Sequence, residues 1–156
     1  MGLDMYLKRE HYVKNWDHNP EEKRFNVKVK MGGKAYEGIN SDKISSISEE
    51  IMYWRKFNAL HNWIITNCAS GVDECQLIDV SKDELIELYN ILKEINVNRD
   101  KAEELLPTAS GFFFGGTDYD DYYFDEVKRT IEELRPYIQD MHEKGSNSYF
   151  VYQASW

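Results

Sequence analysis

The most informative stretch of this 156-residue chain is Tyr53-Trp54-Arg55-Lys56-Phe57-Asn58-Ala59-Leu60-His61-Asn62-Trp63. Apolar side chains recur through it and just beyond it, at Tyr53, Phe57, Leu60 and Ile64. Steps of four, three and four residues place side chains on one face of an α-helix. The spacing therefore predicts a long central helix that begins near Ser48, ends near Asn67 and packs its apolar face into a core.

The neighbouring face of that predicted helix carries Trp54, Arg55, Asn58, His61 and Asn62. A solvated helix face is typically rich in Lys, Glu and Gln, which favour the helix and stay hydrated at little cost. Here Arg55 can hold a phosphate or carboxylate through two parallel hydrogen bonds, and the amides of Asn58 and Asn62 lie one turn apart. Trp54 and His61 flank the amides and can hold the flat ring of a ligand between them. This face therefore predicts a ligand-binding surface. The alternative is a Trp54 in the core, an Arg55 paired with an acid such as Glu50, and amides that cap nearby backbone.

The rest of the chain shows strand and helix patterns without a repeat or a linker, which predicts one domain over residues 1–156. Strands are expected at 2–13, 25–30, 34–36, 76–80 and 148–153, with Gly32-Gly33 as a hairpin turn. Further helices are expected after Ser81, which forms a capping box with Glu84, at 101–106, and from about 121 through 144. Pro136 is expected to kink or end the last of these helices.

The predicted fold class is α+β. The N-terminal strand, the hairpin and the C-terminal strand are expected to form a small antiparallel sheet, and the two terminal strands are expected to pair. Three to four helices, including the long central one, are expected to pack with this sheet.

Two further segments predict parts of a ligand site. Residues 111–116, Gly-Phe-Phe-Phe-Gly-Gly, predict a short buried strand or a turn, with Phe113 as a ring that can face a ligand. Residues 118–126 mix acids with aromatic residues, and most of these acids suit the start of a helix. Tyr119 and Tyr122 are expected to line a pocket in which one acid accepts a hydrogen bond from a ligand. A divalent cation is disfavoured here, because the acids do not follow the order of a calcium loop.

The charge is unevenly distributed along the chain, whose formal net charge is −9. Residues 1–67 hold 11 Lys and Arg against 9 Asp and Glu, whereas the remainder holds 8 against 19. The acidic half should repel phosphates, so general nucleic-acid binding is not expected. No stretch approaches the roughly 20 apolar residues of a membrane span, and the start lacks the apolar region of a signal peptide. A cytoplasmic protein without a membrane partner is the expectation.

Sequence motifs give little support to a metal site, a cofactor or an enzyme. The two cysteines, Cys68 and Cys75, have no second pair, and the four histidines are scattered, so neither a metal nor a cofactor is expected. No Gly-x-Ser-x-Gly nucleophile motif is present. Cys68 follows His61 by seven residues, about 10 Å along a helix, so a Cys–His contact is not expected. We therefore predict no catalytic residues and favour a binding protein.

Three motifs together resemble one group of small proteins encoded by bacteriophages and prophages. They are Met1-Gly2-Leu3-Asp4-Met5-Tyr6-Leu7, Tyr53-Trp54-Arg55-Lys56 with His61-Asn62-Trp63, and Leu105-Leu106-Pro107-Thr108 with Gly111-Phe112-Phe113-Phe114-Gly115. The resemblance covers most of the chain except the hairpin near residues 20–40. It implies a phage protein that acts in the cytoplasm of the bacterial host. Small phage proteins of this sort often counter host defences, by trapping a nucleotide immune signal or by occluding a defence protein.

These observations predict a small-ligand-binding protein that sequesters a nucleotide-derived bacterial immune signal, and that forms a homo-oligomer. The expected binding residues are Trp54, Arg55, Asn58, His61, Asn62, Phe113, Tyr119 and Tyr122. Two alternatives stay open at this point. One is an acidic inhibitor of a host defence protein, and the other is an enzyme that degrades a nucleotide signal.

Overall fold

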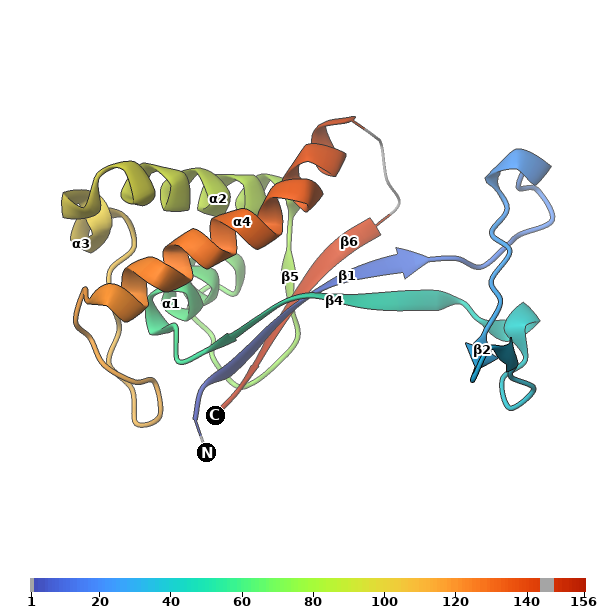
Figure 1. Ribbon diagram of the computed structural model, residues 1–156, viewed down its shortest axis with the longest axis horizontal. Coiled ribbons are helices and arrows are strands. Elements are labelled where there is room, and N and C mark those ends of the chain that lie inside the picture. The colour runs from blue at the N-terminus through green and yellow to red at the C-terminus, as the bar shows by residue number, and fades with distance from the viewer. Residues whose placement is uncertain (1, 144–147) are drawn as a thin grey trace.

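A four-stranded antiparallel sheet runs through the centre of the protein (Figure 1). The computed structural model describes residues 2–143 and 148–156. In spatial order the strands are β4 (Ser46–Arg55), β1 (Asp4–Tyr12), β6 (Ser148–Ser155) and β5 (Ile78–Val80). Within the described residues the helices are α1 (Asn58–Cys68), α2 (Lys82–Val97), α3 (Ala102–Leu105) and α4 (Asp121–Glu143), with short 3-10 turns at Glu21–Lys23, Ser41–Lys43 and Arg99–Lys101. The predicted α+β class is confirmed.

The two terminal strands lie side by side in the middle of the sheet. β1 pairs antiparallel with β6, so that Leu7 lies opposite Tyr152, and the predicted pairing is confirmed. Leu3, Met5 and Leu7 are all buried, and they alternate with more exposed residues. This period of two is what a sheet with one covered face requires.

The predicted long helix is wrong in its first half, because residues 46–55 form the edge strand β4 and α1 begins only at Asn58. β4 pairs antiparallel with β1, and Met52 and Trp54 point into the core while Tyr53 and Arg55 are exposed. A bulge in the pairing lets Ile51 and Met52 both be buried in succession. The apolar residues of this segment fit the spacing of a helix as well as that of a strand, and pairing with β1 decides for the strand.

The hairpin forms a sheet of its own and does not join the main sheet, which differs from the prediction. Its strands are β2 (Lys30–Met31) and β3 (Lys34–Ala35), joined by Gly32 and Gly33 at φ of +59° and +79°. The longer strand predicted at 25–30 is reduced to this short pair. Residues 14–45 extend as an arm from one end of the sheet, while the helices gather at the other end (Figure 1).

The remaining helices follow the sequence closely. Ser81 Oγ accepts from the Glu84 backbone N–H at 3.1 Å and Glu84 Oε2 accepts from the Ser81 N–H at 2.8 Å, so the predicted capping box is confirmed. α4 continues through Pro136, so this proline does not end the helix. Residues 144–147, where the sequence predicts the end of this helix, lie outside the described residues. Within the described part of the chain, no helix is both long enough and apolar enough to cross a membrane.

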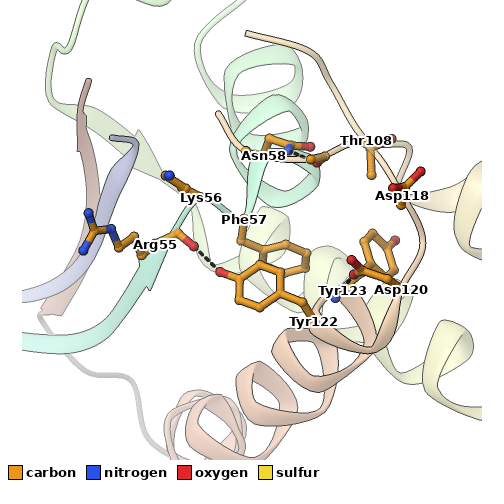
Figure 2. Close-up of a pocket in the computed structure, with 11 residues that line it drawn as sticks. Arg55, Lys56, Phe57, Asn58, Thr108, Asp118, Asp120, Tyr122 and Tyr123 are labelled. Atoms are coloured by element: carbon orange, nitrogen blue, oxygen red, sulfur yellow. Dashed lines mark hydrogen bonds between the residues drawn. The ribbon is translucent and has the colours of Figure 1, made fainter. Parts of the chain in front are cut away.

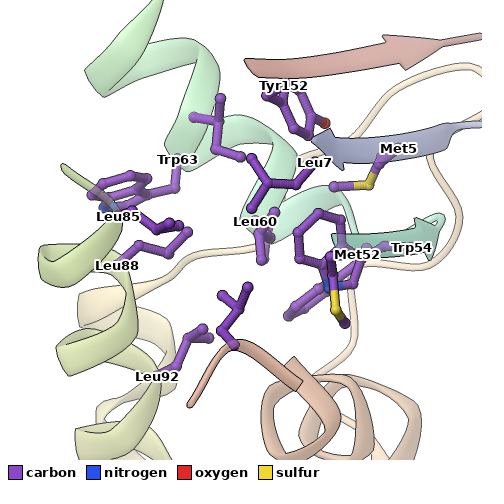
Figure 3. Packing of buried hydrophobic residues seen from close by; sticks show 14 of the residues in the cluster. Met5, Leu7, Met52, Trp54, Leu60, Trp63, Leu85, Leu88, Leu92 and Tyr152 are labelled. Carbon is purple, nitrogen blue, oxygen red and sulfur yellow. The ribbon is translucent and has the colours of Figure 1, made fainter. Parts of the chain in front are cut away.

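The core lies between the sheet and the helices, and Trp54 is among its largest fully buried side chains (Figure 3). The Trp54 side chain is fully buried, and its Nε1 donates to Thr130 Oγ1 at 2.8 Å. The same hydroxyl donates to the Glu126 carbonyl at 2.6 Å, so the indole is tied to α4. Trp54 therefore has no face open to a ligand. This agrees with the alternative interpretation of the sequence, in which Trp54 lies in the core.

Replacing Trp54 with Phe should lower the free energy of unfolding by about 2 kcal/mol, because it removes a buried hydrogen bond and leaves a cavity. Urea denaturation measures the change. The matched control is Trp16→Phe, since Trp16 is half-exposed on the arm and its replacement should change stability by less than about 0.5 kcal/mol. Equal effects for the two variants would contradict the central place given to Trp54.

Candidate ligand-binding site

A cavity of about 460 Å³ opens where the end of β4, the start of α1 and the start of α4 meet the loop after α3 (Figure 2). The first residue of α1, Asn58, is hydrogen-bonded to the backbone of this loop. The cavity is lined by Arg55, Lys56, Phe57, Asn58, Thr108, Gly115, Gly116, Asp118, Asp120, Tyr122 and Tyr123.

The junction between β4 and α1 places two cationic residues at the rim of the cavity. Arg55 is the last residue of the strand, and Lys56 follows it with a φ of +58°. The Lys56 N–H donates to the Leu3 carbonyl at 2.8 Å, which ties this turn to the start of β1. A left-handed backbone costs a residue other than glycine roughly 1 kcal/mol. Strain of this kind is often found at binding sites, where the surrounding structure holds it in place.

Two glycines make room for the Lys56 side chain. A Cβ at Gly2 would lie 3.1 Å from Lys56 Cε, and a Cβ at Gly115 would lie 3.1 Å from Lys56 Cβ. Gly115 also has a φ of +86°, which side chains rarely tolerate. The glycines therefore let the N-terminal segment and the loop approach Lys56 closely from two sides.

Asn58 holds the loop that forms one wall of the cavity. Its Nδ2 donates to the Phe114 carbonyl at 3.0 Å and to the Gly116 carbonyl at 2.8 Å. Its Oδ1 accepts from the Ala109 N–H at 2.9 Å, and the residue is only 3% exposed. The amide predicted to bind a ligand is thus committed to the backbone of the loop, although the residue still borders the cavity.

Aromatic residues at the start of α4 form the floor of the cavity. The Tyr122 hydroxyl donates to the Arg55 carbonyl, and the Tyr123 hydroxyl donates to the Leu106 carbonyl at 2.8 Å. Burial, and after it the charge of Glu126, raises the pKa of Tyr122, so this phenol stays neutral and keeps its donor proton. The Phe57 ring meets the Tyr123 ring edge-to-face, with the two centroids 5.6 Å apart.

Residues of opposite charge border the cavity on two sides, Arg55 and Lys56 on one and Asp118 and Asp120 on the other. The Arg55 guanidinium lies beside Gly2 and points away from Tyr122 (Figure 2), so that only the Arg55 backbone carbonyl meets the Tyr122 hydroxyl. Asp120 Oδ1 accepts from the Tyr123 N–H at 3.1 Å and so caps the start of α4. A ligand with an anionic group at one end and hydrogen-bond donors at the other matches this distribution of charge.

The predicted residue His61 lies in the interior and not beside the cavity. Its Nδ1 lies 2.7 Å from the Tyr152 hydroxyl and its Nε2 lies 3.0 Å from Asp73 Oδ2. Burial, and after it the Asp73 charge, raises the pKa of Tyr152 well above its ordinary value. This group of three side chains, in which Asp73 is partly exposed, links α1 to β6 and to the loop after α1. His61 has no exposed edge for a ligand, because only 1% of the residue is exposed.

The structure brings three of the predicted residues to the cavity, namely Arg55, Asn58 and Tyr122. Five others are not among the described residues that line it: Trp54, His61, Asn62, Phe113 and Tyr119. Tyr119 instead supports the loop, since its hydroxyl accepts from the Thr108 N–H at 3.2 Å. Sequence reasoning missed Lys56 as a lining residue, although it lies within the quoted stretch, and did not single out Asp118 and Asp120 within the acidic segment.

The glycine-flanked segment is a turn, and the alternative of a buried strand is wrong. The Phe114 N–H donates to the Gly111 carbonyl at 3.2 Å, and the Leu3 N–H donates to the Phe113 carbonyl at 3.2 Å. Phe112 at the tip of this turn is 96% exposed, so the three phenylalanines do not share one buried environment.

Cys68 is poorly suited to nucleophilic chemistry. Burial, and after it the nearby Glu84 carboxylate, raises the pKa of its thiol to about 12, so the thiolate is scarce at neutral pH. Among the described residues, no group of three or more His, Cys, Asp or Glu side chains is placed to hold a metal ion.

No known protein family, curated protein or solved structure matches this chain. What the protein does must therefore be argued from the residues of the cavity.

Replacing Asn58 with Asp should lower the free energy of unfolding by about 3 kcal/mol. The carboxylate can still accept from Ala109, but it cannot donate to Phe114 and Gly116, and it would face their carbonyl oxygens. Urea denaturation measures stability, and limited chymotrypsin digestion measures release of the loop at its phenylalanines.

The matched control is Asn62→Asp, one turn further along α1 and only half-buried, which should leave both measurements nearly unchanged. If Asn58→Asp unfolds and is cleaved like the unmodified protein, the loop is held by other contacts.

Proposed function

We propose that the protein binds a small nucleotide-derived ligand in this cavity and sequesters it. In this proposal it is a phage-encoded protein that removes an immune signal of the bacterial host. The observation that supports binding is the presence of two cations, two carboxylates and an aromatic ring around one cavity of about 460 Å³. This volume lies within the usual range of small-molecule sites, about 300–1,000 Å³.

The cationic end of the cavity suits a phosphate. The Arg55 guanidinium lies at the rim beside Gly2, and once turned towards the cavity it can donate two parallel hydrogen bonds to phosphate oxygens. Lys56 adds a compact second charge, and its side chain is positioned by Gly2 and Gly115. Arg55 is the last residue of β4, and Lys56 follows it and donates to the Leu3 carbonyl. The main sheet therefore holds the backbones of both residues.

The acidic end suits the hydroxyl groups of a ribose or the amino group of a base. Carboxylates accept hydrogen bonds, so Asp118 and Asp120 can take up such donors. Tyr122 also lines the cavity, and its ring can stack against a base. Gly116 leaves open space beside its backbone, since a Cβ built there would meet no atom within 4 Å.

Sequestration is favoured over turnover because several polar groups of the cavity are already hydrogen-bonded to the protein itself. The Thr108 hydroxyl donates to the Thr117 carbonyl at 2.8 Å, and Asp120 caps α4. The Tyr122 and Tyr123 hydroxyls donate to backbone carbonyls. These groups hold the walls in place, whereas an enzyme needs a nucleophile or a base free to meet the reacting atom.

Titration calorimetry of the purified protein against cyclic dinucleotides and ADP-ribose isomers tests the proposal. Saturable heat is expected with at least one of them, and Arg55→Ala should weaken that binding by about 10- to 100-fold through loss of charge-assisted hydrogen bonds. Arg135→Ala is the matched control, because Arg135 is exposed on α4 away from the lining residues, and it should bind like the unmodified protein. The absence of heat with every compound, or an Arg55→Ala variant of undiminished affinity, would contradict the proposal.

Mass spectrometry of the ligand recovered after denaturing the complex separates sequestration from catalysis. Sequestration predicts recovery of the compound with its mass unchanged after prolonged incubation. A changed mass would show that the same cavity degrades the signal.

A further inference from the structure

The arm carries a concentrated positive charge at its hairpin. Residues 23–36 contain five cationic side chains and no acid, in a chain whose net charge is −9. The cationic residues are Lys23, Arg24, Lys28, Lys30 and Lys34, and all of them are exposed. We call residues 23–36 the basic hairpin.

The basic hairpin also exposes apolar side chains. Met31 is 68% exposed, and Phe25 and Tyr36 are likewise exposed on the same segment. Its two strands pair only with each other, as a sheet separate from the main one. A lone two-stranded hairpin is marginally stable in water, so contact with another surface would stabilise it. Cations interleaved with exposed apolar side chains are typical of a binding surface.

A groove with the opposite character lies on the other edge of the sheet. It has a volume of about 410 Å³ and is lined by Asp79, Val80, Ser81, Glu84, Tyr149 and Phe150. The surrounding residues 73–87 contain six acids and one lysine, a net charge of −5. Tyr149 is 52% exposed and Leu77 is also exposed, so this acidic groove has apolar surface to bury as well.

We propose that the basic hairpin of one copy of this chain docks into the acidic groove of a second copy. The charges of the two segments are equal and opposite, +5 against −5, and each presents exposed apolar side chains. The hairpin lies at the tip of the arm, well away from β5 beside the groove (Figure 1), so the partner groove belongs to another molecule. Reciprocal docking of two copies uses both pairs of surfaces and closes the assembly as a dimer.

A second copy fits the hairpin better than a nucleic acid does. Outside the basic hairpin the chain carries 28 acids against 14 Lys and Arg, a net charge of −14. That charge repels a polyanion, but the same charge attracts a basic segment of another copy.

Light scattering after size exclusion measures the mass in solution. At low salt the expected mass is about twice the 18.5 kDa of one chain, and at high salt it should fall towards one chain, because opposite charges at exposed surfaces are screened. Lys30→Glu/Lys34→Glu should be a monomer at low salt. The control Lys93→Glu/Lys128→Glu changes the net charge equally on α2 and α4, and it should remain a dimer.

Charge exchange between the two surfaces gives the sharpest test. Asp79→Lys/Glu87→Lys should also be a monomer on its own, and both residues are exposed, so the fold should tolerate the change. Mixing this variant with Lys30→Glu/Lys34→Glu should restore a dimer that contains one copy of each, because one docking contact keeps its native charges and the other places the introduced Glu side chains opposite the introduced Lys side chains. Arg55→Ala should remain a dimer, so failure of ligand binding and failure of dimerisation are separate results.

Three results would overturn the proposal. One is a monomeric unmodified protein at low salt. Another is a mixture of the two charge-reversed variants that stays monomeric while each variant retains its circular dichroism spectrum. The third is a monomer that binds a single-stranded DNA or RNA oligonucleotide through the basic hairpin. If Lys30→Glu/Lys34→Glu abolished this binding, nucleic acid would be the partner of the hairpin.

Discussion

The backbone turn at Lys56 determines where every wall of the cavity lies. It ends the edge strand β4, donates a hydrogen bond to the Leu3 carbonyl, and lets α1 begin two residues later. Arg55 is thereby left at the rim, and Asn58 points at the loop that it holds. A glycine would adopt this left-handed turn at lower cost, but it would bring no positive charge to the cavity. The same residue, Lys56, therefore carries both the backbone strain and a positive charge of the site.

The parts of the fold that the sequence predicts well carry local signals. The capping box at Ser81 involves residues three apart, and buried residues alternate with more exposed ones over the first half of β1. The segment 48–55 lacks such a signal, because its apolar run suits a helix or a strand equally. Its conformation is decided by pairing with β1, whose partner residues lie 38 to 51 positions earlier in the chain, and by a bulge that no local pattern reveals.

The residues of the candidate site also divide into those that the sequence predicts and those whose role depends on distant partners. Arg55 and Asn58 are predicted as neighbours on one helix face, and Tyr122 is predicted from a separate segment that mixes acids with aromatic residues. The role of Asn58 depends on carbonyls 56 and 58 residues further along the chain, so its commitment to the loop cannot be predicted locally. The burial of Trp54 and His61 likewise depends on partners in α4 and β6. Lys56 was missed because nothing in the sequence marks a left-handed backbone at a lysine.

Backbone amide NMR spectra recorded during titration with a cyclic dinucleotide that gives calorimetric heat test the central claim most directly. The amides of Gly115 and Gly116 fall in a distinctive region of the spectrum and border the cavity beside Lys56. Binding in the cavity should shift the signals of these glycines, of Lys56 and of Asp118, while those of the basic hairpin stay in place. Shifts confined to other parts of the chain, with the two glycines unmoved, would contradict binding at this site.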